Sequence, residues 1–360
     1  MDIGILSMQQ VANYGSFLQA YGLKSTLEQL GHRVEFIDII PGEQLPEYKQ
    51  GKMAKLRKGF SRLNCLNPFK MVYYSLLLHK RFAKEFIPAL YSGNRENQPR
   101  FDCVVVGSDE VFNIAQSTWF GFAPQLFGEG LNAHKVISYA ACCGAMTVEK
   151  LSELGLTERV RELLKGNFSA ISVRDLNSFN LVKELTGDSP EMNIDPVLLY
   201  EFPKELPVSV AHSGSKYMII YTYPNRMRNK TEISAIKAYA RKHQLRIISM
   251  GDYFDWVDEV VTPTPFEVLA YFREATCVVT DTFHGTVMSM KYNKRFATIV
   301  RGMNSNKLTG LLGQFGLDGR IVSEMGQLDA ILDSAIDYTP VNQQIAEERR
   351  RSIDYLKANL

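Results

Sequence analysis

The stretch Cys-Val-Val-Thr-Asp-Thr-Phe-His-Gly-Thr, residues 277–286, decides the fold, because it runs from an apolar segment through a polar turn into a helix pattern. Residues 277–280 predict a buried β-strand, and residues 285–292 predict the helix that follows it. A strand that is apolar on both faces and leads at once into a helix is typical of parallel α/β sheets. We therefore expect the same unit to recur on either side of this stretch.

The second half of the chain repeats this unit. Further strands are predicted at 217–222, 245–249 and 296–299, and further helices at 230–243 and 265–273. They make residues 216–335 a parallel-sheet domain, preceded by a linker rich in Pro, Ser and Gly at 202–215. Residues 340–360 predict a long helix that crosses back to the first domain.

The first half shows the same alternation. Residues 3–6, 16–30 and 34–40 predict a strand, a helix and a strand, which form the β-α-β unit of a parallel sheet, and later strands are predicted at 103–106, 135–141 and 170–174. At 360 residues the chain exceeds the roughly 250 to 300 at which a single core stops growing. We therefore predict an α/β protein with two Rossmann-like parallel-sheet domains, 1–205 and 216–335, that face each other across a cleft.

Composition excludes several classes of protein. Apolar residues make up 45% and charged residues 22% of the chain, as in ordinary globular proteins. The N-terminus lacks the basic stretch and long apolar core of a signal peptide, and the longest apolar run, Met71 to Leu78, is far shorter than the roughly 20 residues that cross a bilayer. The five cysteines include no Cys-x-x-Cys pair, which argues against a disulfide framework and a zinc site. We expect a cytoplasmic protein.

Charge is distributed unevenly along the chain. Ten Lys and Arg residues and no Asp or Glu lie between Lys49 and Lys84, within a helical insert predicted at 49–90. Apolar residues are interleaved at helical spacing, which predicts basic amphipathic helices of the kind that lie on anionic membranes. The alternative is a solvated basic face on ordinary surface helices. The segment has no recognisable nucleic-acid fold, so nucleic acid is not an expected partner.

The polar turn at 281–286 is the first candidate for a functional site. A buried strand delivers the carboxylate of Asp281, the hydroxyl of Thr282 and the imidazole of His284 to a helix N-terminus, which Gly285 and Thr286 continue. Free backbone N–H groups and the helix dipole favour an anion there, and His284 beside it would exchange a proton near neutral pH. The alternative is that Asp281 and Thr282 only cap the helix while His284 packs.

Two further strand ends carry polar side chains. The first strand is followed by residues that suit an anion or sugar cradle: Asn13, Tyr14, Gly15, Ser16 and Gln19. The strand at 103–106 is followed by Ser108, Asp109, Glu110 and Asn113. The two carboxylates would bind sugar hydroxyls or act as a base, although helix capping explains these residues equally well.

Arg174 emerges at the end of the strand predicted at 170–174. A guanidinium there would grip a carboxylate through two hydrogen bonds, and the alternative is an ion pair with Asp175 or another neighbour. Several familiar patterns are missing from the sequence: it has no Gly-rich dinucleotide or P-loop motif, no nucleophile elbow, and no metal-ligand spacing among its six histidines. Neither a metal nor a cofactor is therefore expected.

The sequence resembles the polysaccharide pyruvyl transferase family in six ordered blocks. The blocks are 13–21 (Asn-Tyr-Gly-Ser-Phe-Leu-Gln-Ala-Tyr), 101–109 (ending in Gly-Ser-Asp), 137–141 (Ile-Ser-Tyr-Ala-Ala), 171–175 (Ile-Ser-Val-Arg-Asp), 193–199 (Asn-Ile-Asp-Pro-Val-Leu-Leu) and 280–286 (Thr-Asp-Thr-Phe-His-Gly-Thr). The resemblance runs through nearly the whole chain. It implies a fold like that of the two-domain GT-B glycosyltransferases, with residues 1–205 on the acceptor side and residues 216–335 on the donor side.

The resemblance also implies an activity, the transfer of pyruvate from phosphoenolpyruvate to a sugar as a cyclic ketal. The carboxylate and phosphate of phosphoenolpyruvate call for a guanidinium and a helix N-terminus. His284 is then the acid that protonates the methylene carbon, Arg174 holds an anionic group of the donor, and Asp109 positions or deprotonates the acceptor hydroxyl. Another branch of the family has arginine in place of Thr282, and here we expect Arg301 or Lys307, on the loop after the last predicted strand, to replace it.

Three hypotheses about function follow. The leading one is a pyruvyl transferase of cell-surface polysaccharide assembly, whose acceptor sugar is carried on a lipid diphosphate and whose segment 49–84 contacts the anionic inner face of the membrane. The second is a GT-B-type glycosyltransferase that uses a nucleotide sugar. The third is a carbohydrate-binding relative without catalytic activity.

Overall fold

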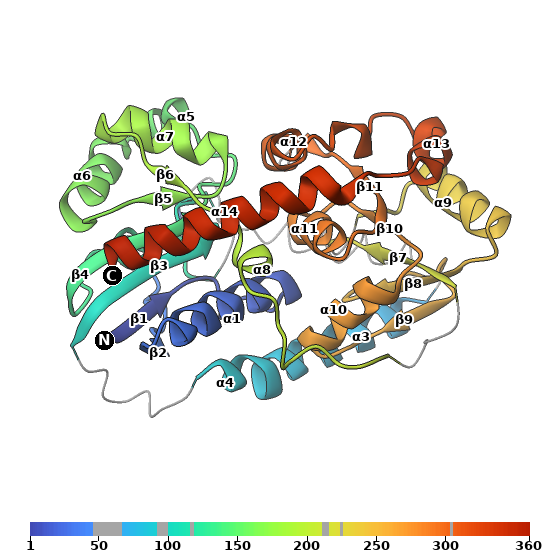
Figure 1. Ribbon diagram of the computed structural model, residues 1–360, viewed down its shortest axis with the longest axis horizontal. Helices are drawn as coiled ribbons and strands as arrows, with labels where there is room; N and C mark the ends of the chain where they lie inside the picture. Colours follow the sequence, from blue (N-terminus) through green and yellow to red (C-terminus); the bar gives the residue numbers. More distant parts are fainter. Residues whose placement is uncertain (46–66, 92–99, 116–118, 211–215, 224–225, 303–304) are drawn as a thin grey trace.

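The computed structural model describes residues 1–45, 67–91, 100–115, 119–210, 216–223, 226–302 and 305–360. Within these residues the chain forms two parallel β-sheets of six strands each, and helices cover both faces of each sheet (Figure 1). The predicted α/β class with two parallel sheets is thereby confirmed.

The first sheet has the strand order β2-β1-β3-β4-β5-β6. Its strands are β1 (Asp2–Leu6), β2 (Arg33–Phe36), β3 (Phe101–Asp109), β4 (Ala133–Ala141), β5 (Ser172–Val173) and β6 (Glu191–Met192). The register brings Ile5 of β1 beside Phe36 on one side and Val105 on the other. Strand β3 is apolar and buried over almost its whole length, because helices cover both of its faces.

Side chains of β3 alternate between two apolar clusters, as the two-residue period of a strand requires. Cys103 and Val105 share a cluster with α1 (Tyr14–Gln29) and α8 (Pro196–Leu199). Val104 and Val106 belong to a second cluster, on the other face, with the elements η4 (Pro124–Phe127), α5 (Val148–Glu153), α6 (Thr157–Asn167) and α7 (Leu176–Thr186). The first sheet is therefore the middle layer of three.

The second sheet has the strand order β12-β11-β10-β7-β8-β9. Its strands are β7 (Tyr217–Tyr221), β8 (Arg246–Met250), β9 (Glu259–Val261), β10 (Cys277–Thr280), β11 (Arg295–Ile299) and β12 (Ile321–Val322). One face packs on α9 (Lys230–Lys242) and α13 (Leu328–Asp333), and the other on α10 (Pro265–Glu274), α11 (Phe283–Lys291) and α12 (Ser305–Gln314). The strand of the opening stretch, β10, lies between β7 and β11.

Helix ends agree with local signals in the sequence. Asn13 caps the start of α1, and Gly31 follows its end with φ +90°, a conformation that glycine adopts without strain. Thr264 and Glu267 form a capping box around the start of α10, with Pro265 in its first turn.

Several boundaries differ from the sequence prediction. The edge strands β6, β9 and β12 were not predicted, because two or three residues are too few to show an alternating pattern. The strand predicted at 34–40 ends at Phe36, and the strand predicted at 170–174 is reduced to Ser172–Val173. Because β12 follows β11, Arg301 and Lys307 do not lie on a loop after the last strand, and Lys307 is part of α12.

One apolar core extends through both sheets. The Phe266 ring of α10 lies edge-on to Phe17 and Tyr21 of α1, with ring centroids 5.8 and 4.9 Å apart. The Tyr14 hydroxyl donates a hydrogen bond to Pro263 O at 2.8 Å. Because one buried cluster includes side chains from both sheets, packing sets the position of one sheet relative to the other.

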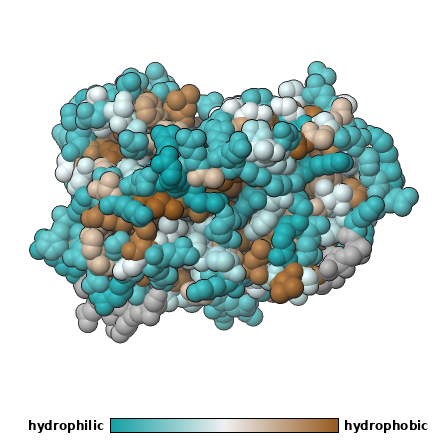
Figure 2. Space-filling view, in the orientation of Figure 1, coloured by the Kyte–Doolittle hydropathy of each residue, from teal (hydrophilic) through white to brown (hydrophobic). Residues whose placement is uncertain are grey.

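Helix α14 (Tyr338–Asn359) runs from the second sheet back across the first (Figure 1). It begins with the N-cap Asp337 and contains most of the helix predicted at 340–360. Ile194 N donates to Ser352 Oγ at 3.0 Å, and the Tyr355 hydroxyl donates to Ser138 O at 2.8 Å. The face of the molecule that α14 crosses is mainly hydrophilic (Figure 2).

The basic insert connects the two sheets. Its described part contains α3 (Pro68–Arg81), η3 (Phe82–Phe86) and α4 (Ile87–Leu90), while residues 46–66 lie outside the described residues. Arg81 donates to Thr262 O on the side of the second sheet, and the Phe82 ring lies 5.3 Å from that of Tyr14. None of the helices in the described parts of the chain has the length and apolar character needed to span a bilayer.

The hydrogen bond between Ser352 of α14 and Ile194, which follows β6, gives a stability prediction. The change Ser352→Ala leaves the buried Ile194 N–H without its acceptor, so we expect the free energy of unfolding to fall by about 1–3 kcal/mol. Urea-induced unfolding measures this. Arg350→Ala, on the exposed side of the same helix, is the control and should change stability by no more than about 0.5 kcal/mol. If both substitutions changed the free energy of unfolding equally, the Ser352 hydroxyl would not be the acceptor that stabilises α14.

Candidate active site

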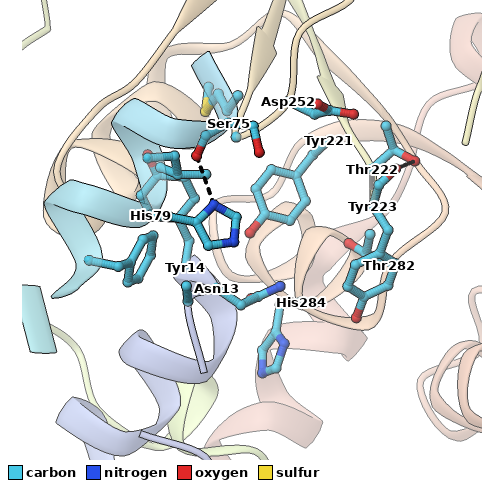
Figure 3. Close-up of a pocket in the computed structure, with 15 residues that line it drawn as sticks. Asn13, Tyr14, Ser75, His79, Tyr221, Thr222, Tyr223, Asp252, Thr282 and His284 are labelled. Carbon is cyan, nitrogen blue, oxygen red and sulfur yellow. Dashed lines mark hydrogen bonds between the residues drawn. The ribbon is translucent and has the colours of Figure 1, made fainter. Parts of the chain in front are cut away.

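A pocket lies between the two sheets, where the carboxyl ends of their strands meet (Figure 3). It encloses about 740 Å³ of space, including its open mouth. Its walls come from the start of α1, from α3 and η3, from the ends of β7 and β8 with the residues that follow them, and from the turn after β10: Ala12, Asn13, Tyr14, Ser75, Leu78, His79, Phe82, Tyr221, Thr222, Tyr223, Met250, Gly251, Asp252, Thr282 and His284. Open parallel sheets bind ligands at such an edge.

Thr282 begins α11 as its N-cap. Its Oγ1 accepts from Gly285 N at 2.9 Å, and its own carbonyl accepts from Thr286 Oγ1 at 3.1 Å. Thr280 Oγ1 donates to Tyr221 O at 2.6 Å and so ties the turn to β7. The capping alternative is therefore correct for Thr282, whose side chain also lines the pocket.

Asp281 is fully buried and binds protein groups. Its Oδ1 accepts from Thr222 Oγ1 at 2.6 Å, and its Oδ2 accepts from Arg301 Nε at 2.6 Å. The two remaining guanidinium nitrogens of Arg301 donate to the Glu232 carboxylate at 3.0 and 3.1 Å. Asp281 and Arg301, both predicted to contact a substrate, thus build the wall behind the turn.

His284 reaches the start of α1 and lies against Gly15. A Cβ at position 15 would be 2.3 Å from His284 Cγ and Nδ1, so only glycine allows this approach. Asn13 Oδ1 accepts from Gly15 N at 2.7 Å and from Ser16 N at 3.3 Å, which caps α1. The first turn of α1 therefore forms a flat platform for the imidazole of the opposite domain.

A buried ionic network continues behind His284. His284 Nε2 lies 3.6 Å from Asp195 Oδ2, which also accepts from Arg174 Nη1 at 2.6 Å. Arg174 Nη2 donates to Asp109 Oδ1 at 3.3 Å, and Ser16 Oγ donates to Asp109 Oδ2 at 2.9 Å. Arg174 thus forms ion pairs with Asp109 and Asp195, and its contact with a substrate stays a prediction.

The cations of this network keep both carboxylates ionised. Burial would raise the pKa of Asp195, but His284 and Arg174 outweigh burial and lower it to about 2. Burial would likewise raise the pKa of Asp109, but Arg174, His284 and Lys307 hold it below its ordinary value. A carboxylate with a depressed pKa is a weak base, so Asp109 is poorly suited to deprotonate a hydroxyl.

Four other side chains that were predicted to contact a substrate bind protein groups and do not line the pocket. Lys307 of α12 forms an ion pair with Glu110, and Asn113 Nδ2 donates to Glu110 Oε2 at 2.6 Å. Gln19 Nε2 donates to Ser7 Oγ at 2.9 Å, and Ser108 Oγ donates to Ala140 O at 3.1 Å. Lys307, Asn113, Gln19 and Ser108 therefore support the wall from behind.

The pocket also contains side chains that were not predicted from the sequence. Tyr221 ends β7, Tyr223 follows it, and Asp252 follows β8, so the strand-end rule that selected Thr282 would have found them too. His79 comes from α3, and no sequence signal places that helix at the pocket. Its Nδ1 lies 2.7 Å from Ser75 O and, because a carbonyl oxygen only accepts, donates to it.

The chemistry that this arrangement supports is proton transfer. An imidazole backed by a buried carboxylate is the pattern of a general acid or base, and His284 with Asp195 forms it. Aromatic rings such as those of Tyr221 and Tyr223 offer flat surfaces for a sugar ring. In the parts of the chain that the structure describes, no group of three or more His, Cys, Asp or Glu side chains is arranged to hold a metal ion.

Comparison with known sequences identifies one family. The family model described as "Polysaccharide pyruvyl transferase" matches residues 13–302. The matched region begins at the N-cap of α1 and includes Asp109, Arg174, Asp195 and His284. A search of the curated proteins finds no match.

Solved structures of the same fold include glycosyltransferases and epimerases. A spinosyn rhamnosyltransferase has a TM-score of 0.52 at 10% identity, over 99% of both chains. A putative UDP-N-acetylglucosamine 2-epimerase from Listeria monocytogenes has a TM-score of 0.55 at 10% identity, over 99% of this chain and 96% of the other. The UDP-GlcNAc 2-epimerase from Neisseria meningitidis has a TM-score of 0.51 at 12% identity, over 100% of both. At these identities the likeness shows the GT-B-like fold alone.

The contact between Gly15 and His284 gives a second prediction. A methyl group from Gly15→Ala must displace the imidazole, so we expect a shifted His284 ring resonance in NMR spectra and a loss of about 1–3 kcal/mol in the free energy of unfolding. Gly166→Ala is the matched control, because no atom lies within 4 Å of a Cβ there. An unchanged His284 resonance in Gly15→Ala would refute the close approach.

The buried carboxylate gives a prediction about pH. Asp195→Asn deprives the buried Arg174 of a charged partner, so we expect a loss of about 3–5 kcal/mol at neutral pH. Because the pKa of Asp195 is depressed in the folded state, its contribution exists above the ordinary value of 3.8 and disappears as pH falls through about 2. The difference in unfolding free energy between the two proteins should therefore shrink over that interval.

Urea unfolding at several pH values measures this difference. Asp329→Asn, which breaks an exposed ion pair with Lys242, is the control and should cost no more than about 1 kcal/mol. A difference that stays constant down to the lowest pH would show that the Asp195 carboxylate is not the source of the effect.

Proposed function

Because the chain belongs to the polysaccharide pyruvyl transferase family, we propose that it transfers pyruvate from phosphoenolpyruvate to a sugar and forms a cyclic ketal. The observation that carries this proposal is the position of His284, in a pocket between the two sheets with the ionised Asp195 behind its Nε2. The arrangement supports the proposal because ketal formation requires an acid at the place where donor and acceptor meet.

The proposed reaction begins with a proton transfer to carbon. Protonated His284 gives a proton to the methylene carbon of phosphoenolpyruvate, and the adjacent C2 becomes an oxocarbenium-like centre. One sugar hydroxyl adds to C2 and releases its proton, the phosphate leaves with the electrons of its C–O bond, and a second hydroxyl adds and releases its proton. One of these two protons restores His284, and the other leaves with the phosphate or the solvent.

The neighbours of His284 have supporting roles in this proposal. With Nε2 directed at Asp195, Nδ1 is the nitrogen that delivers the proton, and the carboxylate orients the ring. Arg174 and Asp109 neutralise each other and hold Asp195 and Ser16 in position. We therefore assign them to positioning, in place of the donor clamp and the base that the resemblance implied.

The donor also needs a cationic contact, which we assign to Arg226. Arg301 and Lys307, the expected replacements for an arginine at position 282, are paired with buried or half-buried carboxylates. Arg226 is also paired with Asp281, but more loosely than Arg301: its Nη1 lies 3.7 Å from Asp281 Oδ2 and donates to Asp281 O at 3.4 Å, whereas Arg301 Nε lies 2.6 Å from Oδ2. The Arg226 guanidinium lies 4.9 Å from the centre of the Tyr223 ring, which lines the pocket. Its side chain keeps 26% of its surface exposed, so an anionic ligand has access to it.

The acceptor is proposed to be a sugar of a cell-surface polysaccharide precursor, carried on a lipid diphosphate. The family supports the polysaccharide, and the basic segment 49–84 motivates the anionic lipid carrier and a contact with the inner face of the membrane. Most of the Lys and Arg residues of this segment lie in 46–66, outside the described residues.

The choice of donor is tested by thermal unfolding. Phosphoenolpyruvate at about 100 times its Kd should stabilise the protein by about 2.7 kcal/mol, which is a rise of several degrees in Tm, while nucleoside diphosphates should have no effect. Arg226→Gln should reduce the rise, and Arg159→Gln, at an exposed ion pair far from the pocket, should not. The opposite preference, for a nucleoside diphosphate, would favour the nucleotide-sugar glycosyltransferase instead.

The role of His284 is tested by turnover. In an assay of phosphate release from phosphoenolpyruvate with a panel of sugar acceptors, His284→Gln should lower kcat by about 10²–10⁴-fold and keep the thermal shift with phosphoenolpyruvate. His134→Gln, an exposed histidine on β4, should retain full activity. Normal turnover in His284→Gln would exclude it as the acid. Binding without turnover in the unmodified protein across the panel would favour the non-catalytic relative.

A further inference from the structure

Helix α3 exposes a row of large apolar side chains. Phe69 is 86% exposed, Tyr73 61%, Leu76 65% and Val72 42%. These are four of the nine large hydrophobic side chains that are exposed in the described part of the chain, and their spacing of three and four residues puts them on one face of the helix. Single exposed apolar residues are normal, but a continuous row marks an interaction surface. We call these four residues the outer face of α3.

Basic residues accompany the outer face. Lys70 and Lys80 are exposed on the same helix, and Lys84 is exposed on η3. No acidic residue lies between positions 67 and 84, and the next one, Glu85, is paired with Arg81. The surface therefore combines aromatic and aliphatic side chains with an uncompensated positive charge. This combination is complementary to the headgroup region of an anionic phospholipid bilayer.

The opposite side of α3 is fixed by the fold. Met71 is buried with Tyr253, and Leu78 and Phe82 pack towards Tyr14. Ser75 and His79 lie at the pocket, and Figure 3 shows the His79 ring at the pocket edge of this helix. Because these contacts hold α3 firmly against the protein, its outer face is not exposed merely because the helix is loosely attached.

We propose that the outer face of α3 docks into the surface of an anionic phospholipid bilayer. Phe69, Tyr73 and Leu76 enter the boundary between headgroups and acyl chains, and the lysines bind the phosphates. Because the same helix forms a wall of the pocket, docking brings the pocket to the level of the headgroups. A lipid-linked sugar would then reach the pocket without leaving the membrane, and this last step alone rests on the proposed function.

A second copy of the chain is a less suitable occupant of this surface. In a two-fold dimer the same surface meets itself, so the two rows of lysines would lie close together without an acidic partner. A bilayer surface supplies many phosphates instead. Charge complementarity therefore favours the lipid.

Flotation with vesicles tests the proposal on the full-length protein. The unmodified protein should float with vesicles of phosphatidylcholine mixed with phosphatidylglycerol, and it should remain at the bottom with phosphatidylcholine alone. The double substitution Phe69→Ser with Leu76→Ser should reduce the partition coefficient at least about tenfold, because it removes two inserted apolar side chains. Lys70→Ser with Lys80→Ser should reduce it by a similar factor, and added salt should weaken binding further.

The matched control is Leu176→Ser with Val208→Ser, two equally exposed apolar residues on other parts of the surface. This control should float like the unmodified protein. Flotation of the Phe69/Leu76 variant at the unmodified level would overturn the proposal. A failure of the unmodified protein to float would overturn it as well. If sedimentation then showed a dimer that the Phe69/Leu76 variant dissociates, a second copy of the chain would be the occupant of the outer face.

Two measurements separate this proposal from the proposed function. Flotation requires neither phosphoenolpyruvate nor an acceptor, so it succeeds or fails independently of the donor chemistry. The Phe69/Leu76 variant should keep the thermal shift with phosphoenolpyruvate, which also shows that it is folded. Loss of flotation with an intact thermal shift is the result that we expect.

Discussion

The absence of a side chain at Gly15 is the constraint on which the rest of the site depends. It lets the His284 imidazole lie directly on the first turn of α1, so that the N-termini of α1 and α11 converge on one pocket. Two helix N-termini and Arg174 bring positive charge to this region. The buried carboxylates of Asp195 and Asp109 bring negative charge, so the imidazole lies between groups of opposite charge.

The part of the site that follows from strand order was predictable from the sequence. Asn13, Tyr14, Thr282 and His284 follow strands of parallel sheets, and the carboxyl ends of such strands share one edge. The sequence does not show whether a polar residue at that edge faces the ligand or supports the wall. Gln19 has the same local signals as the others but is turned into the protein, because its partner Ser7 lies beneath the helix.

Other features depend on contacts between segments that are distant in the sequence. Arg174 was predicted to clamp a ligand because an isolated guanidinium at a strand end suits an anion, but two carboxylates from other segments already occupy it. Helix α3 was predicted from its spacing, and its place at the pocket depends on packing against Tyr253 and Tyr14. The short edge strands β9 and β12 are formed by pairing with longer neighbours, not by their own pattern.

The charge balance of the site bears on how an anionic donor is accommodated. Around the pocket, the acids Asp109, Glu110, Asp195, Glu232, Asp252 and Asp281 are paired with five permanent cations, Arg174, Lys307, Arg301, Arg226 and Arg228. Before a donor binds, the carboxylates therefore outnumber these cations by one. A donor with several negative charges upsets this balance unless the site takes up a proton or a cation leaves its carboxylate. Arg226 lies 3.7 Å from Asp281 Oδ2, the longest of these ion-pair distances, so it is the cation that an anionic donor draws most easily from its carboxylate.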